Sequence, residues 1–186
     1  MRQLKTLIHP SINIEQGSQL KTLIHPSINI EQGSQFTRIT ARAIAMHKQH
    51  ILLMYTKRYD DFSLPGGGVD EHESIEQGLI RELQEETGAQ NIIIKKEFGL
   101  YEEYRPWYKD DFDIIHIKSY CYVCNIDQKL GQAQLEHYEQ QNGMIAKWVD
   151  INEAIAHNER TLATSDKQGL SIIRETYLLK EIAKQL

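Results

Sequence analysis

The sequence predicts a single α/β domain with a mixed β-sheet and helices on both faces. Apolar residues follow strand and helix periodicities in the order β-β-α-β-β-β-α-α, which is the pattern of a sheet covered by helices. The 186 residues suit one domain, and a hydrophobic content of 40% provides for a core without metal or disulfide support. No change in composition marks a second domain boundary.

Alternating apolar and polar residues predict the strands. Residues 37–47 place Ile39, Ala41 and Ala43 on one side and polar residues on the other, which is typical of a half-buried strand. The other expected elements are a turn at residues 48–50, a strand at 51–56, a polar loop at 59–62, strands near 92–101, 112–124 and 144–149, a polar loop at 127–143, and helices at 151–157 and 170–184.

A helix is expected between Ser74 and Gly88. Ser74 and Gln77 have capping-box spacing at its start, and Gly88 is a natural stop at its end. Apolar residues at i, i+4 and i+8 from Ile75 form a stripe that predicts the buried face.

Three carboxylates lie beside that stripe rather than opposite it. At about 100° per residue, Glu82 and Glu86 fall within about 20° of Ile75, and Glu85 falls about 80° away. Carboxylates at the edge of a core need a counter-charge, and hard divalent cations such as Mg²⁺ or Mn²⁺ supply one. The alternative is a solvated acidic face in which Arg81 pairs with Glu85. The preceding glycine turn at residues 66–68 favours the metal, because it lets the backbone approach an ion or a phosphate.

The segment resembles the Nudix box, whose pattern is G-x5-E-x7-R-E-U-x-E-E-x-G-U, with U a bulky aliphatic residue. Residues 62–67 resemble the aromatic-x-L-P-G-G lead-in of that family, and the resemblance extends over about residues 37–156. One departure is Gly78, where the family usually has Ala; a mid-helix Gly costs about 1 kcal/mol and indicates close backbone packing. The box positions in this chain are Gly67, Glu73, Arg81, Glu82, Leu83, Glu85, Glu86, Gly88 and Ala89.

The resemblance implies a Nudix-like α/β/α sandwich that uses Mg²⁺ or Mn²⁺ to hydrolyse a pyrophosphate bond by attack of water on phosphorus. By similarity, Glu82, Glu85 and Glu86 are metal ligands, and the backbone carbonyl of Gly67 is a further one. Arg81 is expected to orient the carboxylates through a salt bridge with Glu85 or with Glu73.

The resemblance assigns the metal ligands but leaves more than one candidate for the general base and for substrate binding. Glu136 and Glu139 lie in the loop where many relatives carry the base, while Glu82 or Glu85 is the rival choice. Arg38 and Arg42 share one side of a strand that borders the substrate in related proteins. Tyr104 is a candidate for stacking on a base, but the family rule that uses a Tyr or a Pro in this window does not decide the substrate, because Pro106 also falls there.

The sequence is compatible with three functions. The preferred one is hydrolysis of a nucleoside diphosphate linked to another moiety, with ADP-ribose or a nucleotide sugar as substrate. The second is a nucleoside triphosphate pyrophosphohydrolase, and the third is a Nudix-fold module that binds nucleotides without turnover. A complete set of box glutamates disfavours the third, because a module that only binds has no need of a metal site.

The charge distribution supports a small phosphorylated substrate. The net charge of the chain is −5, and residues 67–89 alone carry −6, so the rest of the chain is nearly neutral. Without clustered Lys and Arg, no binding of extended nucleic acid is expected. A bound Mg²⁺ would reverse the sign of the acidic segment and attract a polyphosphate.

Cysteine content and hydropathy give the expected location. Two cysteines form no disulfide framework and suit the cytoplasm, and the C-x-x-C spacing of Cys121 and Cys124 does not predict zinc, because on a strand these side chains point to opposite faces. No transmembrane segment or signal peptide is expected. A homodimer is possible, since dimers are common in the family.

The N-terminal segment repeats itself. Residues 3–18 and 19–34 are identical, which favours a recent duplication or a cloning product over a functional tandem motif, and two copies are too few for a solenoid. Residues 1–34 are therefore expected to be a tail preceding the domain at residues 35–186. The apolar alternation at Ile28 and Ile30, and at Ile12 and Ile14 in the first copy, predicts an edge strand.

Overall fold

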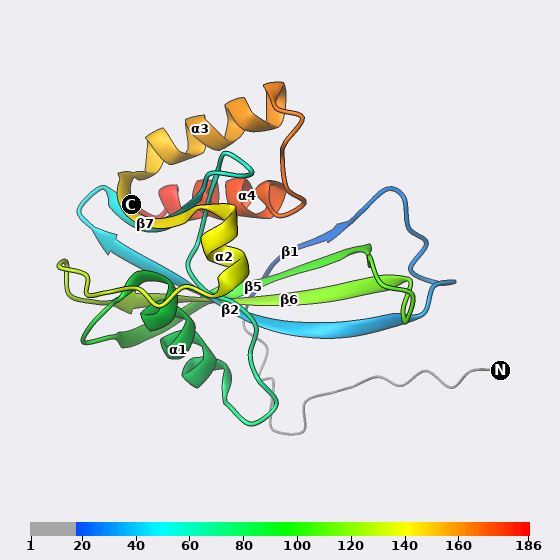
Figure 1. Ribbon diagram of the computed structural model, residues 1–186, viewed down its shortest axis with the longest axis horizontal. Coiled ribbons are helices and arrows are strands. Elements are labelled where there is room, and N and C mark those ends of the chain that lie inside the picture. The colour runs from blue at the N-terminus through cyan, green and yellow to red at the C-terminus, as the bar shows by residue number, and fades with distance from the viewer. Residues whose placement is uncertain (1–17) are drawn as a thin grey trace.

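The computed structural model describes residues 18–186 and contains a mixed sheet with α1 on one face and α3 and α4 on the other (Figure 1). The predicted α/β sandwich is confirmed. The elements in chain order are β1 (Gln19–Ile24), β2 (Gln35–His47), β3 (His50–Thr56), β4 (Asp61–Ser63), α1 (Ile75–Thr87), β5 (Ile93–Pro106), β6 (Ile114–Asn125), α2 (His137–Asn142), β7 (Met144–Asp150), α3 (Ile151–Thr164) and α4 (Ile172–Ala183).

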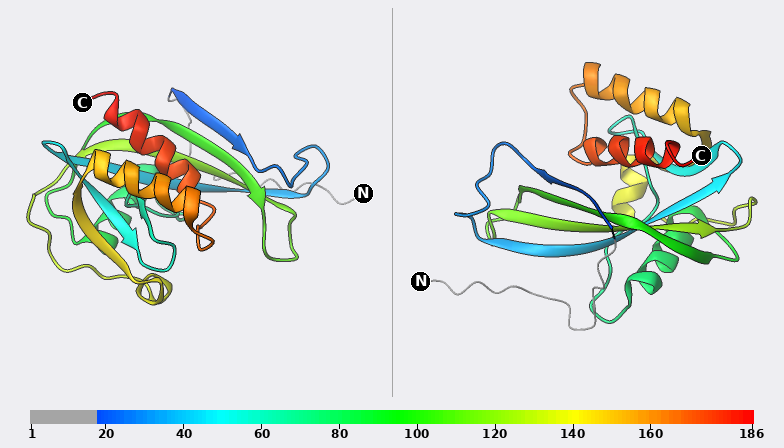
Figure 2. Two further views of the ribbon diagram at one scale, coloured as in Figure 1. Left: turned by 90° about the horizontal axis from the view of Figure 1, so that it is seen from above. Right: turned by 180° about the vertical axis from the view of Figure 1, so that it is seen from behind.

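The sheet is ordered β1-β5-β6-β2-β3-β4, with β7 also paired to β3. The long strand β2 joins its two parts: it runs parallel to β6 from Gln35 to Ala45 and then pairs antiparallel with β3 through a tight turn. Lys48 in that turn has a φ of 55°, which accommodates the sharp reversal predicted at residues 48–50. Figure 2 shows α3 and α4 together on one side of the sheet and β1 at its edge.

Two apolar clusters hold the layers together, one on each face of β2. On the α1 side, Ala41, Ala43 and Ala45 are at most 1% exposed, and their small side chains let α1 approach the sheet closely. Leu79 and Leu83 of α1 pack there, as the stripe predicts. The cluster under α3 and α4 contains larger side chains, among them Ile44, Leu53, Tyr101, Leu178 and Leu179.

The structure corrects three elements. The loop predicted at residues 59–62 contains β4, and the loop predicted at 127–143 contains α2. Both elements are short and polar, so periodicity does not reveal them. The helix predicted to end at residue 157 continues to Thr164, because Asn158 and Thr161 are buried polar residues that bond to the β3–β4 segment.

The second repeat copy forms an edge strand at a different place from the one predicted. Ile28 and Ile30 lie in an irregular segment, whereas Gln19–Ile24 pairs parallel with β5. Leu20 and Leu23 pack against the cluster under α4, and Tyr177 donates a hydrogen bond to the Leu20 carbonyl at 3.1 Å. The sheet therefore extends into the segment expected to be a tail. The first copy, including Ile12 and Ile14, falls outside the described residues except for Ser18, and its peripheral placement stays a prediction.

Within residues 18–186, no helix is both long enough and apolar enough to cross a membrane.

Asn158 fixes β4 to α3, which gives a test of the fold. Its side chain is fully buried, accepts a hydrogen bond from the Phe62 N–H and donates one to the Phe62 carbonyl, both at 2.8 Å. Asn158→Ala leaves both backbone groups without a partner, so the free energy of unfolding in urea should fall by roughly 2–4 kcal/mol. Asn152→Ala, at an exposed position of the same helix, is the control; equal losses in the two variants would contradict this account.

Candidate functional site

The acidic helix α1 begins and ends as the sequence predicts. Ser74 and Gln77 form a reciprocal capping box, with Gln77 N–H to Ser74 Oγ at 3.1 Å and Ser74 N–H to Gln77 Oε1 at 2.8 Å. Gly88 ends the helix in the left-handed region with φ 69°. A side chain at Gly78 would place its Cβ 2.9 Å from Glu73 Oε1, which agrees with the close packing expected there.

Arg81 is the centre of the acidic cluster. It donates to Glu73 at 2.6 and 3.1 Å, to Glu82 at 2.9 Å and to Glu85 at 3.2 Å, and it also bonds the Gly68 carbonyl at 2.9 Å. The predicted pairing with Glu73 or Glu85 is confirmed, and both form. Hydrogen bonds from Arg81 lower the pKa of the Glu73 carboxyl, and those with Glu73 raise the pKa of Arg81 itself. The guanidinium thus fixes carboxylates from the loop and from α1 with a single charge.

Glu86 points inward and is only 5% exposed. Its Oε2 accepts the Gly66 N–H at 2.6 Å. The pKa of Glu86 is raised to about 8, mainly by burial. The nearby carboxylates Glu139 and Glu82 also raise this pKa, whereas the Gly66 N–H and the Arg42 charge lower it. Burial also raises the pKa of Glu82. Two carboxyls are therefore held where a cation would stabilise their charged form.

The glycine turn needs its glycines because the backbone of β2 and the Glu82 side chain of α1 lie against it. Gly66 has φ 131°, and a Cβ there would lie 2.0 Å from the Ala41 carbonyl oxygen. A Cβ at Gly67 would lie 2.5 Å from the carboxylate of Glu82. The Gly67 carbonyl accepts the Ala41 N–H at 3.0 Å, so the predicted ligand carbonyl keeps one lone pair free of that bond.

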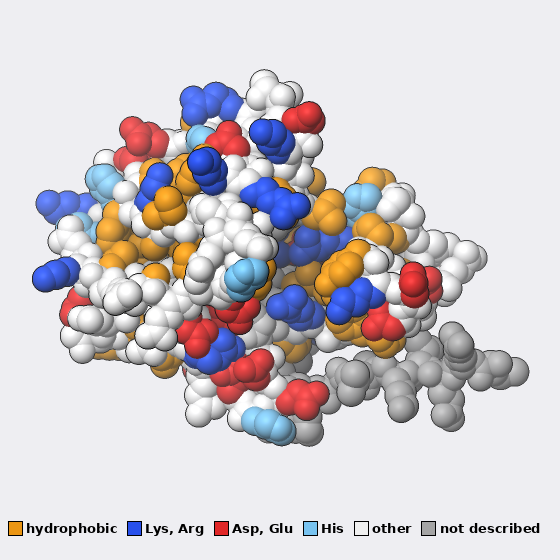
Figure 3. Space-filling view, in the orientation of Figure 1, with side chains coloured by type: hydrophobic (Ala, Val, Ile, Leu, Met, Phe, Trp, Pro, Cys, Tyr) orange, Lys and Arg blue, Asp and Glu red, His pale blue; other side chains and the backbone are white. Residues whose placement is uncertain are grey.

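A cavity of about 250 Å³ lies beside the turn. Side chains of the sheet and of the helices line it. Figure 3 shows acidic side chains gathered over α1 and its preceding loop, with Lys and Arg side chains above them. Arg38 and Arg42, predicted to contact substrate, both line the cavity. The other charged residues of its wall are Asp61, Glu86, Arg105, Glu139 and Arg174.

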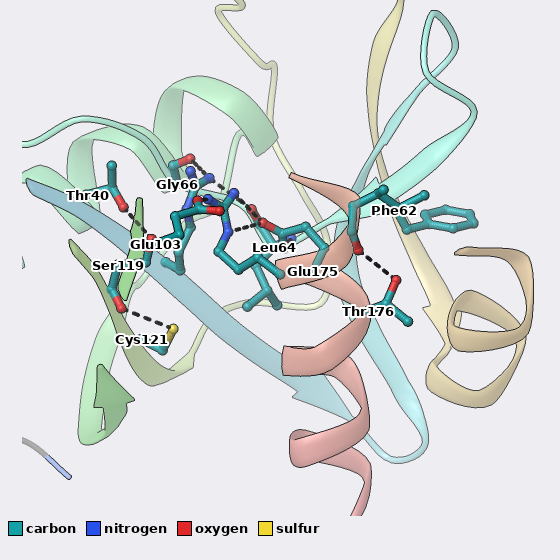
Figure 4. Close-up of polar contacts among 12 residues, drawn as sticks. Thr40, Phe62, Leu64, Gly66, Glu103, Ser119, Cys121, Glu175 and Thr176 are labelled. Atoms are coloured by element: carbon teal, nitrogen blue, oxygen red, sulfur yellow. Dashed lines mark hydrogen bonds and ion pairs between the residues drawn. The ribbon is translucent and has the colours of Figure 1, made fainter. Parts of the chain in front are cut away.

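Helix α4 connects the cavity to the glycine turn through buried charges (Figure 4). Glu175 is fully buried, and its Oε2 accepts the Leu64 N–H at 2.9 Å. Its other oxygen accepts from Arg174 at 2.7 Å, and Arg174 also bonds Glu103 of β5, which in turn pairs with Arg105 at 3.2 Å. This network holds the start of the turn from the side opposite α1.

Sequence reasoning missed Arg105, Arg174, Glu103 and Glu175. The available signal was their position: charged residues at 174 and 175 interrupt the apolar pattern of a helix whose neighbours at 172, 178, 179 and 182 are buried. Such charges are almost never buried unless paired.

The two candidate bases, Glu136 and Glu139, differ in burial and in their position relative to the cavity. Glu139 is 4% exposed and lines the cavity, where its carboxylate accepts the Glu136 N–H at 2.7 Å and the Tyr138 hydroxyl at 3.2 Å. Glu136 is exposed at the start of α2 and does not line the cavity. The structure therefore brings only Glu139 to the site.

Tyr104, expected to stack on a base, does not line this cavity. It lies on the opposite face of β5 from Arg105, because neighbouring residues of a strand point to opposite sides. There its ring stacks on His116 with centroids 4.1 Å apart, and His116 Nε2 lies 2.6 Å from Glu102.

In the described part of the chain, no three acidic, His or Cys side chains converge into a closed metal cage. Arg81 occupies the space between Glu82 and Glu85, and Glu86 is bonded to the backbone. The donor chemistry fits a hard cation, because all the candidate ligands are oxygens and one carboxylate is buried without a side-chain cation bonded to it. The turn also brings Gly67 and Glu82 into contact, as a shared ion would need.

Comparison with known proteins gives the family. The NUDIX domain model matches residues 37–170, and the chain therefore belongs to the NUDIX domain family. The matched segment contains every box position, so the resemblance found in the sequence is confirmed.

Two curated proteins are similar over part of the chain. One is "Putative 8-oxo-dGTP diphosphatase" of Bacillus subtilis (strain 168), 41% identical over 63 residues, which are 34% of this chain and 40% of that protein. The other is the RNA pyrophosphohydrolase of Ruthia magnifica subsp. Calyptogena magnifica, 35% identical over 75 residues, which are 40% of each chain. The alignments thus span about two fifths of the length of these relatives.

Solved structures share the fold. A NUDIX hydrolase from Nitrosomonas europaea superposes with a TM-score of 0.55 at 18% identity, covering 80% of this chain and 90% of the other. The solution structure of the E. coli ORF135 protein gives a TM-score of 0.50 at 18% identity, with 80% and 92% covered. At this identity the likeness shows the architecture alone.

The buried Glu86 carboxyl makes metal-free stability depend on pH. Its pKa is raised from 4.5 to about 8, so ionising it opposes folding increasingly between those values. Glu86→Gln should stabilise the metal-free protein against urea at pH 9, and this gain should disappear at pH 4, where the carboxyl is protonated in both states. Glu76→Gln, at an exposed position of α1, is the control. A Glu86→Gln effect that is the same at both pH values would contradict the raised pKa.

Proposed function

We propose that this protein is a divalent-metal-dependent pyrophosphohydrolase that cleaves a phosphoanhydride bond in a small nucleotide-like substrate. The observation that carries the proposal is the buried carboxylate Glu86, held against the glycine turn at one wall of a cavity whose other walls carry arginines. Carboxylates for a cation and guanidinium groups for phosphate oxygens thus line one space, which is what an anionic anhydride requires.

Members of the NUDIX family generally use a divalent metal. Glu82, Glu85 and Glu86, with the Gly67 carbonyl, are the residues that would hold it, and the all-oxygen donor set suits Mg²⁺ or Mn²⁺. Bound there, the metal supplies neutralisation of phosphate charge and activation of water. Arg81 keeps the carboxylates oriented, and Gly66 fixes Glu86 through its N–H.

Glu139 is the residue best placed to act as general base. Its carboxylate lines the cavity and is held by the Glu136 N–H and the Tyr138 hydroxyl. In the reaction, the water oxygen bonds to one phosphorus and one water proton passes to Glu139. The bond from that phosphorus to the bridging oxygen breaks, and the bridging oxygen leaves with the electron pair on the second phosphate. Glu139 then releases its proton to solvent.

Two substrate classes fit this chemistry. ADP-ribose or a nucleotide sugar is the class preferred from the sequence. Nucleoside triphosphates are the second class. The names of the two curated relatives, "Putative 8-oxo-dGTP diphosphatase" and "RNA pyrophosphohydrolase", support that class for this chain. A binding module without turnover is disfavoured, because the chain contains the complete set of box carboxylates together with a buried candidate base.

A cytoplasmic location and a homodimer stay predictions.

Glu86→Gln tests the proposed activity. The amide has the same shape but cannot supply negative charge, so metal-dependent hydrolysis should fall by at least about 10²-fold. The products are a nucleoside monophosphate and a sugar phosphate from a nucleotide sugar, or a shorter nucleotide with phosphate or pyrophosphate from a triphosphate. The measurement is a product-release screen over nucleoside diphosphate derivatives and nucleoside triphosphates with Mg²⁺ and with Mn²⁺. The far-UV circular dichroism spectrum should be unchanged, and Glu76→Gln should remain active. Full activity of Glu86→Gln would rule out its assigned role.

The general base is tested by a matched pair in one helix segment. Glu139→Gln should lower kcat by about 10²- to 10⁴-fold with little change in KM, since it removes a proton acceptor and keeps the shape of the cavity. Glu136→Gln should leave kcat within about twofold, because Glu136 is exposed outside the cavity. Equal, small effects in both variants would assign the base to Glu82 or Glu85 instead.

A further inference from the structure

The edge of β5 and the ring of Tyr177 on α4 form a strand site, which β1 occupies. Leu20 and Leu23 of β1 are half-buried there and pack against the apolar cluster under α4. Gly99 of β5 has φ 152°, and a Cβ on it would lie 2.7 Å from Leu20 Cγ, so only glycine leaves room for the strand. The Tyr177 hydroxyl donates to the Leu20 carbonyl at 3.1 Å, and the Lys21 ammonium lies 4.7 Å from the centroid of the Tyr177 ring.

The bonds that hold the two ends of the strand are made by the backbone. The strand runs parallel to residues 100–104 of β5. At its start, the Leu100 N–H donates to the Ser18 carbonyl at 3.1 Å, and at its end the His25 N–H donates to the Tyr104 carbonyl at 2.9 Å. Such bonds accept any residue other than proline as donor, so the selectivity of the site lies in the two leucines and the lysine between them.

The first repeat copy contains the same three side chains at the same spacing. Residues 3–18 repeat residues 19–34 without a change, so Leu4 and Leu7 correspond to the two leucines of β1, with a lysine following the first leucine in both copies. The bond from β5 at the start of the strand needs only a backbone carbonyl, which Arg2 would supply. The strand site therefore has no side-chain contact by which it distinguishes one copy from the other.

The second copy is favoured because its connection to β2 is shorter. With Gln19–Ile24 in the strand site, the ten residues 25–34 connect the strand to β2; with residues 3–8 there, the connection is the 26 residues 9–34. The probability of closing a flexible loop falls with about the 3/2 power of its length, so the second copy is favoured about fourfold.

The connection at residues 25–34 adds little to this preference. In the described structure, the hydrogen bonds between His25 and Ser34 stay within the connection, such as that from the Ile28 N–H to the His25 carbonyl at 3.2 Å. Ser34 bonds to Asp113 at 2.7 and 2.8 Å, but it adjoins β2 and keeps this position whichever copy fills the site.

We propose that the strand site is a docking site for either repeat copy, and that residues 3–8 of the same molecule replace Gln19–Ile24 in about one molecule in five. The duplication thus provides a second edge strand for one site. The strand lies beside Glu103, whose carboxylate bonds Arg174 and Arg105 in the cavity wall, so either copy supports that wall. The inference is independent of the proposed activity.

The experiment measures hydrogen exchange of the Leu100 amide, whose N–H is bonded to the strand in the site. The full chain is compared with three variants of it. Leu4→Asp with Leu7→Asp disables the first copy and should change the exchange rate by less than about twofold. Leu20→Asp with Leu23→Asp disables the second copy and should raise the rate about fivefold, because the minority copy then holds the site. All four substitutions together should raise it about tenfold further or more, because neither copy then buries its leucines.

The comparison between the second-copy variant and the fourfold variant decides the outcome. Equal exchange in these two would overturn the inference, because the first copy then gives no protection. Protection of the second-copy variant that rises with protein concentration would also overturn it, since the strand would then come from another molecule. The amides of β3, at the centre of the sheet, should stay protected in every variant, which shows that the domain is folded. If the aspartates unfold the domain, alanine at the same four positions should give the same ranking with smaller differences, and any other ranking overturns the inference.

Discussion

The hydrogen bond from the Gly66 N–H to the buried Glu86 carboxylate is the contact on which the site depends. It requires α1 to lie against the glycine turn, and this is possible only because Gly66 adopts a left-handed φ of 131° beside the backbone of Ala41. The turn is fixed from the sheet as well, since Ala41 N–H bonds the Gly67 carbonyl at 3.0 Å and Ala43 N–H bonds the Pro65 carbonyl at 2.9 Å. Strand β2, the turn and α1 therefore behave as one unit, and the small alanines of β2 make that closeness possible.

Two networks of charged side chains lie on opposite sides of the glycine turn. Arg81 gathers the carboxylates that reach the surface of α1, while Glu86 is buried behind them. On the far side of the turn, Glu175 and Arg174 form a second charged network that bonds the Leu64 N–H. Burying such ions is costly unless every charge is paired and hydrogen-bonded, and here Glu103 and Glu175 together satisfy Arg174. Helix α4 lies beyond residues 37–170, the segment that the family model matches.

How far the sequence predicted the site depended on how local each feature is. The capping box at Ser74, the stop at Gly88 and the buried stripe of α1 are set by residues within a few turns of one another, and all three were predictable. The pairing of Glu73 with Arg81 spans eight positions and still lies within one loop and helix. By contrast, Glu136 and Glu139 are equivalent in the sequence. Only the short helix α2, which periodicity does not reveal, turns one towards the cavity and the other to solvent.

Tyr104 and Arg105 illustrate the same limit in a strand. Both are suitable residues for contacting a nucleotide, and alternation shows that they point in opposite directions without showing which direction is the cavity. The choice follows from the packing of α4, since Glu103 must face Arg174 and Arg105 shares its side of β5. The sequence by itself determined the α/β class, the acidic helix and its glycine turn, because these depend on neighbouring residues. Only the tertiary structure decided which distant charges meet in the cavity, because burial and pairing across strands and helices are properties of the packed chain.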